Sequence, residues 1–209
     1  MEEFSLGQPA VVCRWRLSNG KLPLENRHLR ALAARKAPNE VITTSLVAWA
    51  KQHMEWTLTD GTAEHPDGVL MLVVDTDGKA AMSVGAYRHL THFSANDLLR
   101  RAKSAQKEAL LLHVAPEELW VVRDDVLFWA TSPRFAPAGA CSLVYDLAKT
   151  LGMTVQRDEE LLERVQTQGF TADEVFLVSD EHGVVPASDR SGPRAQKFKA
   201  SYARLLSQT

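Results

Sequence analysis

The chain has 209 residues, of which 45% are hydrophobic and 24% are charged, so it is long enough to bury a core. Its formal net charge of -2 at pH 7 gives no field that would attract nucleic acid or an anionic membrane. It has only two cysteines and no apolar run of the roughly 18 residues that a membrane span needs. We therefore expect a cytoplasmic protein with neither a disulfide scaffold nor a transmembrane segment.

The first part of the chain combines hairpin and helix patterns. Strand-forming residues surround Asn19-Gly20, a pair that accepts positive φ angles and therefore predicts a hairpin turn. Helices are expected over residues 25–36 and 44–56, and a second hairpin turns at Asp77-Gly78. These patterns predict a small N-terminal α/β lobe over residues 1–87.

After residue 87 strands become more frequent. The expected elements are helix 95–107, strands 108–112 and 118–130 (turning at Asp124-Asp125), helix 140–151, strand 153–157, helix 158–166, strands 174–178 and 183–186, and helix 193–206. We therefore expect an α+β fold with a larger, β-rich C-terminal lobe over residues 88–209, flanked by helices.

Three segments together resemble one enzyme family. Residues 172–188, ADEVFLVSDEHGVVPAS, are similar to a family strand pair with the pattern A-D-E-V-F-L-T-G-T-A-x-G-V-x-P-V. Residues 11–32 look like the family's F-E-T strand, hairpin and H-x-x-R-L helix, and residues 121–155 look like its hairpin, L-P-G-I-T-R turn and helix. The family is that of the class IV aminotransferases, which includes D-amino acid and branched-chain aminotransferases and aminodeoxychorismate lyase. The resemblance implies fold type IV, two lobes with a cleft between them, pyridoxal phosphate as the family cofactor, and a homodimer.

The same resemblance indicates that the catalytic lysine has been replaced. The family's K-x-x-N-Y pattern falls on residues 89–93, so His89 stands at the lysine position, and an imidazole cannot form the Schiff base. The family's E-G-S-S-S-N segment falls on residues 113–118. This places His113 at the glutamate that pairs with the pyridine nitrogen, with Glu117 or Glu118 as alternatives. The candidate cleft residues are His89, His92 and His113.

The positions that hold the cofactor phosphate in the family are replaced as well. The arginine of H-x-x-R-L is Ala31, and Arg30 lies about 100° around the helix. The G-I-T turn becomes residues 138–140 (Ala138, Gly139 and Ala140), which keep backbone donors but have no hydroxyl. The T-G-T segment ends on Ser179 and Asp180, and the Asp180 carboxylate would repel a phosphate. From these replacements we predict that pyridoxal phosphate binding is lost and expect no cofactor.

The leading hypothesis is an aminotransferase-like protein without transaminase or lyase activity that has a binding, scaffold or unidentified role, with a small-molecule ligand in the cleft. One alternative is an active pyridoxal phosphate-dependent aminotransferase or aminodeoxychorismate lyase in which a displaced lysine, such as Lys103 or Lys107, reaches the cleft. Another is a metal-dependent enzyme with His89, His113 and His182 as ligands.

Overall fold

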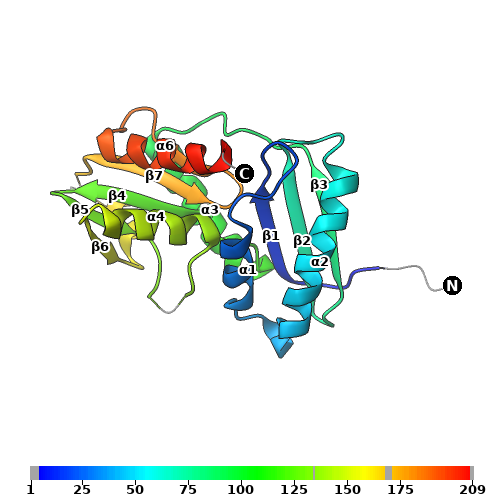
Figure 1. Ribbon diagram of the computed structural model, residues 1–209. Coiled ribbons are helices and arrows are strands. Elements are labelled where there is room, and N and C mark those ends of the chain that lie inside the picture. The colour runs from blue at the N-terminus through cyan, green and yellow to red at the C-terminus, as the bar shows by residue number, and fades with distance from the viewer. Residues whose placement is uncertain (1–4, 134, 168–170, 208–209) are drawn as a thin grey trace.

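The computed structural model describes residues 5–133, 135–167 and 171–207. Its fold is α+β, with two sheets that lie side by side (Figure 1). The smaller sheet is antiparallel and has the order β1-β2-β3, with β1 at Pro9–Arg16, β2 at Val69–Asp75 and β3 at Ala80–Gly85.

The larger sheet has five strands in the order β6-β5-β4-β7-β8. Neighbouring strands are antiparallel except β5 and β6, which pair in parallel. The strands are β4 at Glu118–Arg123, β5 at Val126–Trp129, β6 at Thr154–Arg157, β7 at Glu174–Ser179 and β8 at Gly183–Pro186.

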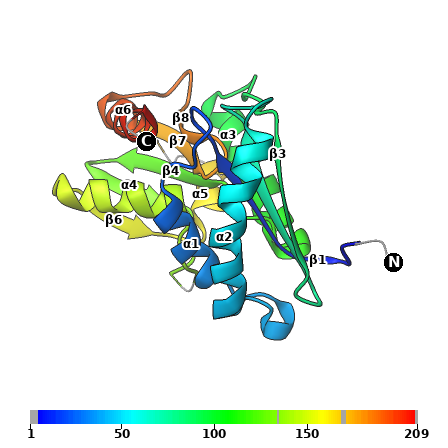
Figure 2. The ribbon, with the colours of Figure 1, turned by 45° about the vertical axis from the view of Figure 1, so that its right-hand side comes forward.

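The helices cover both sheets. They are α1 at Glu25–Ala33, α2 at Thr44–Gly61, α3 at Ala95–Leu112, α4 at Gly139–Thr150, α5 at Leu161–Gln166 and α6 at Pro193–Ser207, with a short 3-10 helix at Pro38–Glu40. Figure 2 shows α1 between α2 and α4, and α1 contacts both of them. Helix α1 therefore links the elements around the smaller sheet to those around the larger one. No helix among the described residues combines the length and apolar character needed to cross a membrane.

Apolar side chains bury both faces of the larger sheet. Along β4, Trp120 and Val122 belong to a cluster with residues of α4 and α6, whereas Leu119 and Val121 belong to a cluster with residues of α3 and α5. This alternation follows from the two-residue period of a strand. A third cluster, which includes Trp15 of β1, fills the space between the smaller sheet, α1 and α2.

Most elements lie where the sequence predicts them, and the turn residues Asn19 and Gly20 have positive φ angles of 49° and 74°. The strand predicted at 108–112 is wrong, because α3 continues through these residues. Glu, Ala and Leu are all good helix formers, and the apolar run that suggested a strand is instead exposed at the end of the helix. Leu110, Leu111 and Leu112 are 71%, 75% and 57% exposed.

Candidate functional site

The two sheets meet where β1 lies against residues 113–115 and the turn after β7. Val12 N–H donates a hydrogen bond to the His113 carbonyl at 3.1 Å, and Arg16 N–H donates one to the Asp180 carbonyl at 3.0 Å. Beside these contacts is a small cavity of about 20 Å³, lined by Arg14, Ala105, Glu108, Val114, Ala115, Glu117, Ser179, Asp180 and Glu181. A cavity of this size holds about one water molecule. The described residues therefore leave little open space at this junction of the two sheets.

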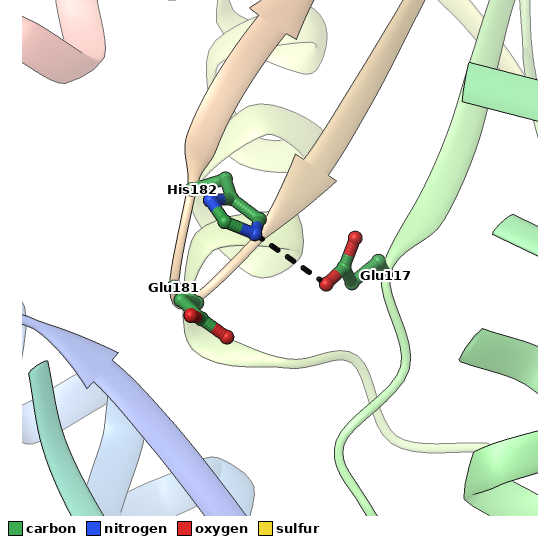
Figure 3. Close-up of side chains that lie close together, drawn as sticks. All are labelled: Glu117, Glu181 and His182. Atoms are coloured by element: carbon green, nitrogen blue, oxygen red, sulfur yellow. Dashed lines mark ion pairs between the residues drawn. The ribbon is translucent and has the colours of Figure 1, made fainter. Parts of the chain in front are cut away.

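The side chains of Glu117, Glu181 and His182 lie close together (Figure 3), and Glu117 and Glu181 also line the cavity. Arg101 of α3 donates two hydrogen bonds to the Glu117 carboxylate, one of them from Nη2 to Oε1 at 2.7 Å. Arg101 Nη2 also lies 2.8 Å from His182 Nε2. Because a guanidinium can only donate, His182 Nε2 is the acceptor, and the imidazole proton is on Nδ1. Nδ1–H then donates to Tyr87 Oη at 3.1 Å.

The electrostatics of His182 agree with this tautomer. Burial lowers the pKa of His182 to about 3, with further lowering from the positive charges of Arg101, Arg14 and Arg16. Only 2% of the His182 side chain is exposed. His182 is therefore neutral near pH 7, so Nε2 keeps the lone pair that accepts from Arg101.

Glu117, Glu181 and His182 also have the spacing of a metal site, since one ligand atom from each lies within 4.8 Å of the others. Two carboxylates and a neutral imidazole are suitable ligands for zinc. Here, however, Arg101 holds both Glu117 oxygens and His182 Nε2. The guanidinium takes the place that a metal cation would need.

A second polar centre lies at the N-terminus of α4. Ala140 N–H donates to Asp180 Oδ1 at 2.7 Å, and His28 Nδ1 of α1 lies 3.4 Å from Asp180 Oδ2. Burial on its own would raise the pKa of Asp180, but His28 and the N–H groups of Ala140 and Gly139 hold this pKa below its usual value. Asp180 is therefore a buried, charged carboxylate that the helix N-terminus and His28 stabilise.

The histidines selected from the sequence do not form one group. His89 is exposed and packs edge-on against Tyr87, with 4.6 Å between ring centroids, and His92 is also exposed. His113 ends α3 in the left-handed conformation, and its carbonyl accepts hydrogen bonds from Val12 and Arg35. Among the described residues, His182 joins Glu117 and Glu181 in a group with metal-ligand spacing, without His89 or His113.

The remaining sequence candidates are spread over several elements. Ala31 is half-buried on α1, and Arg30 Nε donates to the Asn26 carbonyl of its own helix. Ala138 is the N-cap of α4, Gly139 and Ala140 begin that helix, and Ser179 Oγ accepts from His182 N–H at 3.0 Å. Lys103 pairs with Glu163 of α5 at 2.9 Å.

Sequence reasoning missed His28, Arg101 and Tyr87 as members of these centres. His28 had a usable signal, because it is the histidine of the H-x-x-R-L pattern and shares the buried face of α1 with Leu29 and Leu32. Arg101 belongs to a basic stretch of α3, and such a stretch usually indicates a solvent-exposed helix face. Its partners Glu117 and His182 are 16 and 81 residues away, and no local pattern reports contacts at such separations.

No family model and no curated protein matches the sequence. Solved structures match over nearly the whole chain. They include a putative 4-amino-4-deoxychorismate lyase from Legionella pneumophila, at 12% identity and a TM-score of 0.64 over 97% of this chain and 96% of that one. They also include the 4-amino-4-deoxychorismate lyase from Pseudomonas aeruginosa (16% identity, TM-score 0.58, 96% and 94%) and an aminotransferase from Brucella abortus (15% identity, TM-score 0.55, 99% and 95%).

These comparisons contradict the expectation of no cofactor. The Brucella abortus aminotransferase, which has a similar fold, is bound to the cofactor pyridoxal phosphate. The side chains at two described positions do not fit this cofactor. The resemblance places a phosphate at the N-terminus of α4, but there the Asp180 carboxylate accepts the Ala140 N–H. The resemblance places the imine lysine at residue 89, which is a histidine.

At 12% to 16% identity, the three structures have little sequence in common with this chain, yet each match covers at least 96% of it. Such matches establish how the elements are arranged, and they agree with the fold that the sequence resemblance implies. The chain therefore has the fold of the fold type IV pyridoxal phosphate enzymes, the group that contains the class IV aminotransferases and the aminodeoxychorismate lyases.

Proposed function

We propose that this protein is a class IV aminotransferase-like protein that has lost transaminase and lyase activity and uses the cleft between its two sheets to bind a small molecule. The observation that carries this proposal is a histidine, His89, at the position where the sequence resemblance places the imine lysine. A Schiff base requires a primary amine, and no lysine is among the described residues that line the cleft cavity. Lys103 is held by Glu163, and Lys107 is exposed.

The charges of the cleft indicate the kind of small molecule. Among the described residues of the cavity wall, Arg14 is positively charged, and the carboxylates are Glu108, Glu117, Asp180 and Glu181. The neutral His182 and the Tyr87 hydroxyl lie next to them. Charged groups of both signs favour a small zwitterion over an apolar molecule. Because the cavity holds about one water molecule, side chains of its wall must move for such a ligand to enter.

A spectroscopic titration tests the loss of activity. The purified protein is titrated with pyridoxal phosphate, treated with borohydride, and digested so that any labelled lysine is identified by mass spectrometry. We expect no saturable imine band and only scattered labelling of exposed lysines. A band that saturates with one labelled lysine at the cleft would overturn the proposal and restore the active-enzyme alternative. Lys103→Gln is the matched control, since it removes a candidate amine of α3 that does not line the cavity.

The assembly and lobe boundary belong to the same proposal. The apolar surface at the end of α3, formed by Leu110, Leu111 and Leu112, supports a homodimer in which a second copy covers it. We also place the lobe boundary between residues 87 and 88 and the protein in the cytoplasm. Light scattering of the wild type and of Leu111→Glu tests the assembly. We expect a dimer for the wild type and a weaker one for the variant, and a monomeric wild type would contradict the homodimer.

The metal-dependent alternative has one favourable observation, the spacing of Glu117, Glu181 and His182. Because Arg101 already binds two of these side chains, divalent-metal binding in the wild type would require that arginine to move away. Metal content of protein purified without a histidine tag separates this alternative from the leading proposal.

A further inference from the structure

A groove lies between α1 and α2, which are neighbours in the fold (Figure 2). It consists of two adjoining hollows of about 340 and 500 Å³, which share the wall residues Leu29, Ala33 and Val47. Pockets that take small molecules usually measure roughly 300 to 1,000 Å³. None of the described residues that line the groove also lines the cleft cavity. The groove therefore has room for a small ligand at a place separate from the cleft.

The floor of the groove is apolar and rests on packed core residues. Leu29 is a buried member of the cluster between the smaller sheet, α1 and α2, and Ile42 and Val47 are half-buried and pack against that cluster. Ala33 and Ala48 add exposed apolar side chains to the wall. Because close packing supports this floor, an alkyl chain that lies on it would leave water without a rearrangement of the core.

The charged side chains of the wall are both positive. They are Lys51 and Arg30, which are exposed, and no carboxylate is among the described residues that line the groove. Arg30 Nε donates to the Asn26 carbonyl at 3.1 Å, which orients the guanidinium. Thr43 Oγ1 accepts from Leu46 N–H at 3.1 Å, so its hydroxyl proton can be donated to a ligand. In a chain with a net charge of -2, this wall is locally suited to an anion.

We propose that the groove between α1 and α2 binds a medium-chain alkyl carboxylate, with the chain on the apolar floor and the carboxylate at the positive charges of the wall. The planar fork of an arginine donates two hydrogen bonds to a carboxylate, and a lysine attracts it as a point charge. The inference goes beyond the proposed function, because it concerns a separate site and stands whether or not the cleft binds a ligand.

Octanoate is the probe, and calorimetry measures its binding to the full-length protein. The reference ligands are 1-octanol, which has the same chain without the charge, and acetate, which has the charge without the chain. We expect one saturable octanoate site, at least about tenfold tighter than for 1-octanol, and no measurable binding of acetate. Octanoate that binds no more tightly than either reference ligand would overturn the inference.

Two variants locate the site. Ala48→Glu places a carboxylate on the wall, and Lys51→Gln removes one positive charge; both positions are exposed on α2. Each should weaken octanoate binding at least about fivefold. Lys107→Gln is the matched control, since it removes an exposed lysine that does not line the groove. If Lys51→Gln weakens binding no more than Lys107→Gln, the inference is wrong, and this comparison decides alone should Ala48→Glu fail to fold.

Other occupants of the groove and other apolar surfaces give distinct results. Leu111→Glu changes the exposed end of α3 and should bind octanoate as the wild type does. Loss of binding in Leu111→Glu, with both groove variants unaffected, would assign the octanoate to α3 and contradict the inference. Light scattering of Ala48→Glu tests a second copy as the occupant. A changed assembly with unchanged octanoate binding would make the groove a contact between copies, which also contradicts a carboxylate site.

Discussion

His28 Nδ1 lies 3.4 Å from Asp180 Oδ2, with side chains that are only 1% and 5% exposed. One residue comes from α1 and the other from the turn after β7, so the pair joins two elements that lie far apart in the sequence. Because the same carboxylate also accepts from Ala140 N–H, Asp180 connects α1, α4 and the larger sheet. A change in the charge of Asp180, or a ligand bound beside it, should therefore change the stability of the fold.

Removal of this carboxylate should destabilise the fold. Asp180→Ala leaves the Ala140 N–H buried without its acceptor and removes the carboxylate beside His28 Nδ1, and a buried polar group that loses its partner typically costs about 1 to 3 kcal/mol. Urea unfolding measures the change. Glu181→Gln disrupts a more exposed pair with Arg14 at 3.6 Å and should cost less than about 1 kcal/mol. Equal losses in the two variants would contradict a special role for Asp180.

Stability should fall as the pH drops below neutrality, because of His182. Its pKa is about 3 in the folded protein, against 6.5 for an ordinary histidine, so between these values the unfolded chain binds a proton that the folded protein does not. Falling pH therefore favours unfolding, by about 2 kcal/mol at pH 5. Asp180 acts in the same direction at lower pH, since its pKa is also held below its usual value.

The measurement is the free energy of unfolding from pH 7.5 to pH 4.5 for the wild type and His182→Gln. The variant should lose most of the slope between pH 6.5 and pH 5, because glutamine does not titrate. An unchanged slope in the variant would show that other groups produce the pH dependence.

Arg101 should determine whether the cluster at the cleft accepts a metal. In Arg101→Met, Glu117 and His182 lose the guanidinium that binds them, which leaves Glu117, Glu181 and a neutral His182 as three ligands at suitable spacing. We expect Zn²⁺ to bind this variant at least about tenfold more tightly than the wild type. Calorimetry with Zn²⁺ measures this, with Arg101→Met/His182→Gln as the control that removes one ligand. Tight binding of Zn²⁺ by the wild type would show that Arg101 does not block the site.

The sequence predicted the elements whose signals are local. The turn at Asn19-Gly20 depends on two adjacent residues that accept positive φ, and both have it in the structure. The prediction for the end of α3 was wrong because periodicity alone does not distinguish a short apolar run in a buried strand from one at the exposed end of a helix. The contacts of Arg101 with Glu117 and His182 could not be predicted, since they depend on how α3 packs against the larger sheet. The sequence resemblance to the family placed Asp180 at the phosphate position, but only the structure shows which groups Asp180 contacts there.

Close packing of His28 against α4 gives a last prediction. Gly139→Ala places a Cβ 2.5 Å from His28 Nδ1 and 3.3 Å from the His28 backbone nitrogen, and the backbone cannot move as easily as a side chain. Forced overpacking typically costs about 1 to 3 kcal/mol, and here it should also push α1 and α4 apart. Gly85→Ala is the control, because an added Cβ there meets nothing within 4 Å.

A double-mutant cycle separates the two contacts that Gly139→Ala disturbs. If the clash is mainly with the imidazole, Gly139→Ala should cost less in a His28→Ala background than in the wild type, by an amount comparable with the clash itself. Thermal and urea unfolding of the four proteins provide the cycle. Additive losses would mean that the new methyl group clashes mainly with the α1 backbone at residue 28 and not with the imidazole.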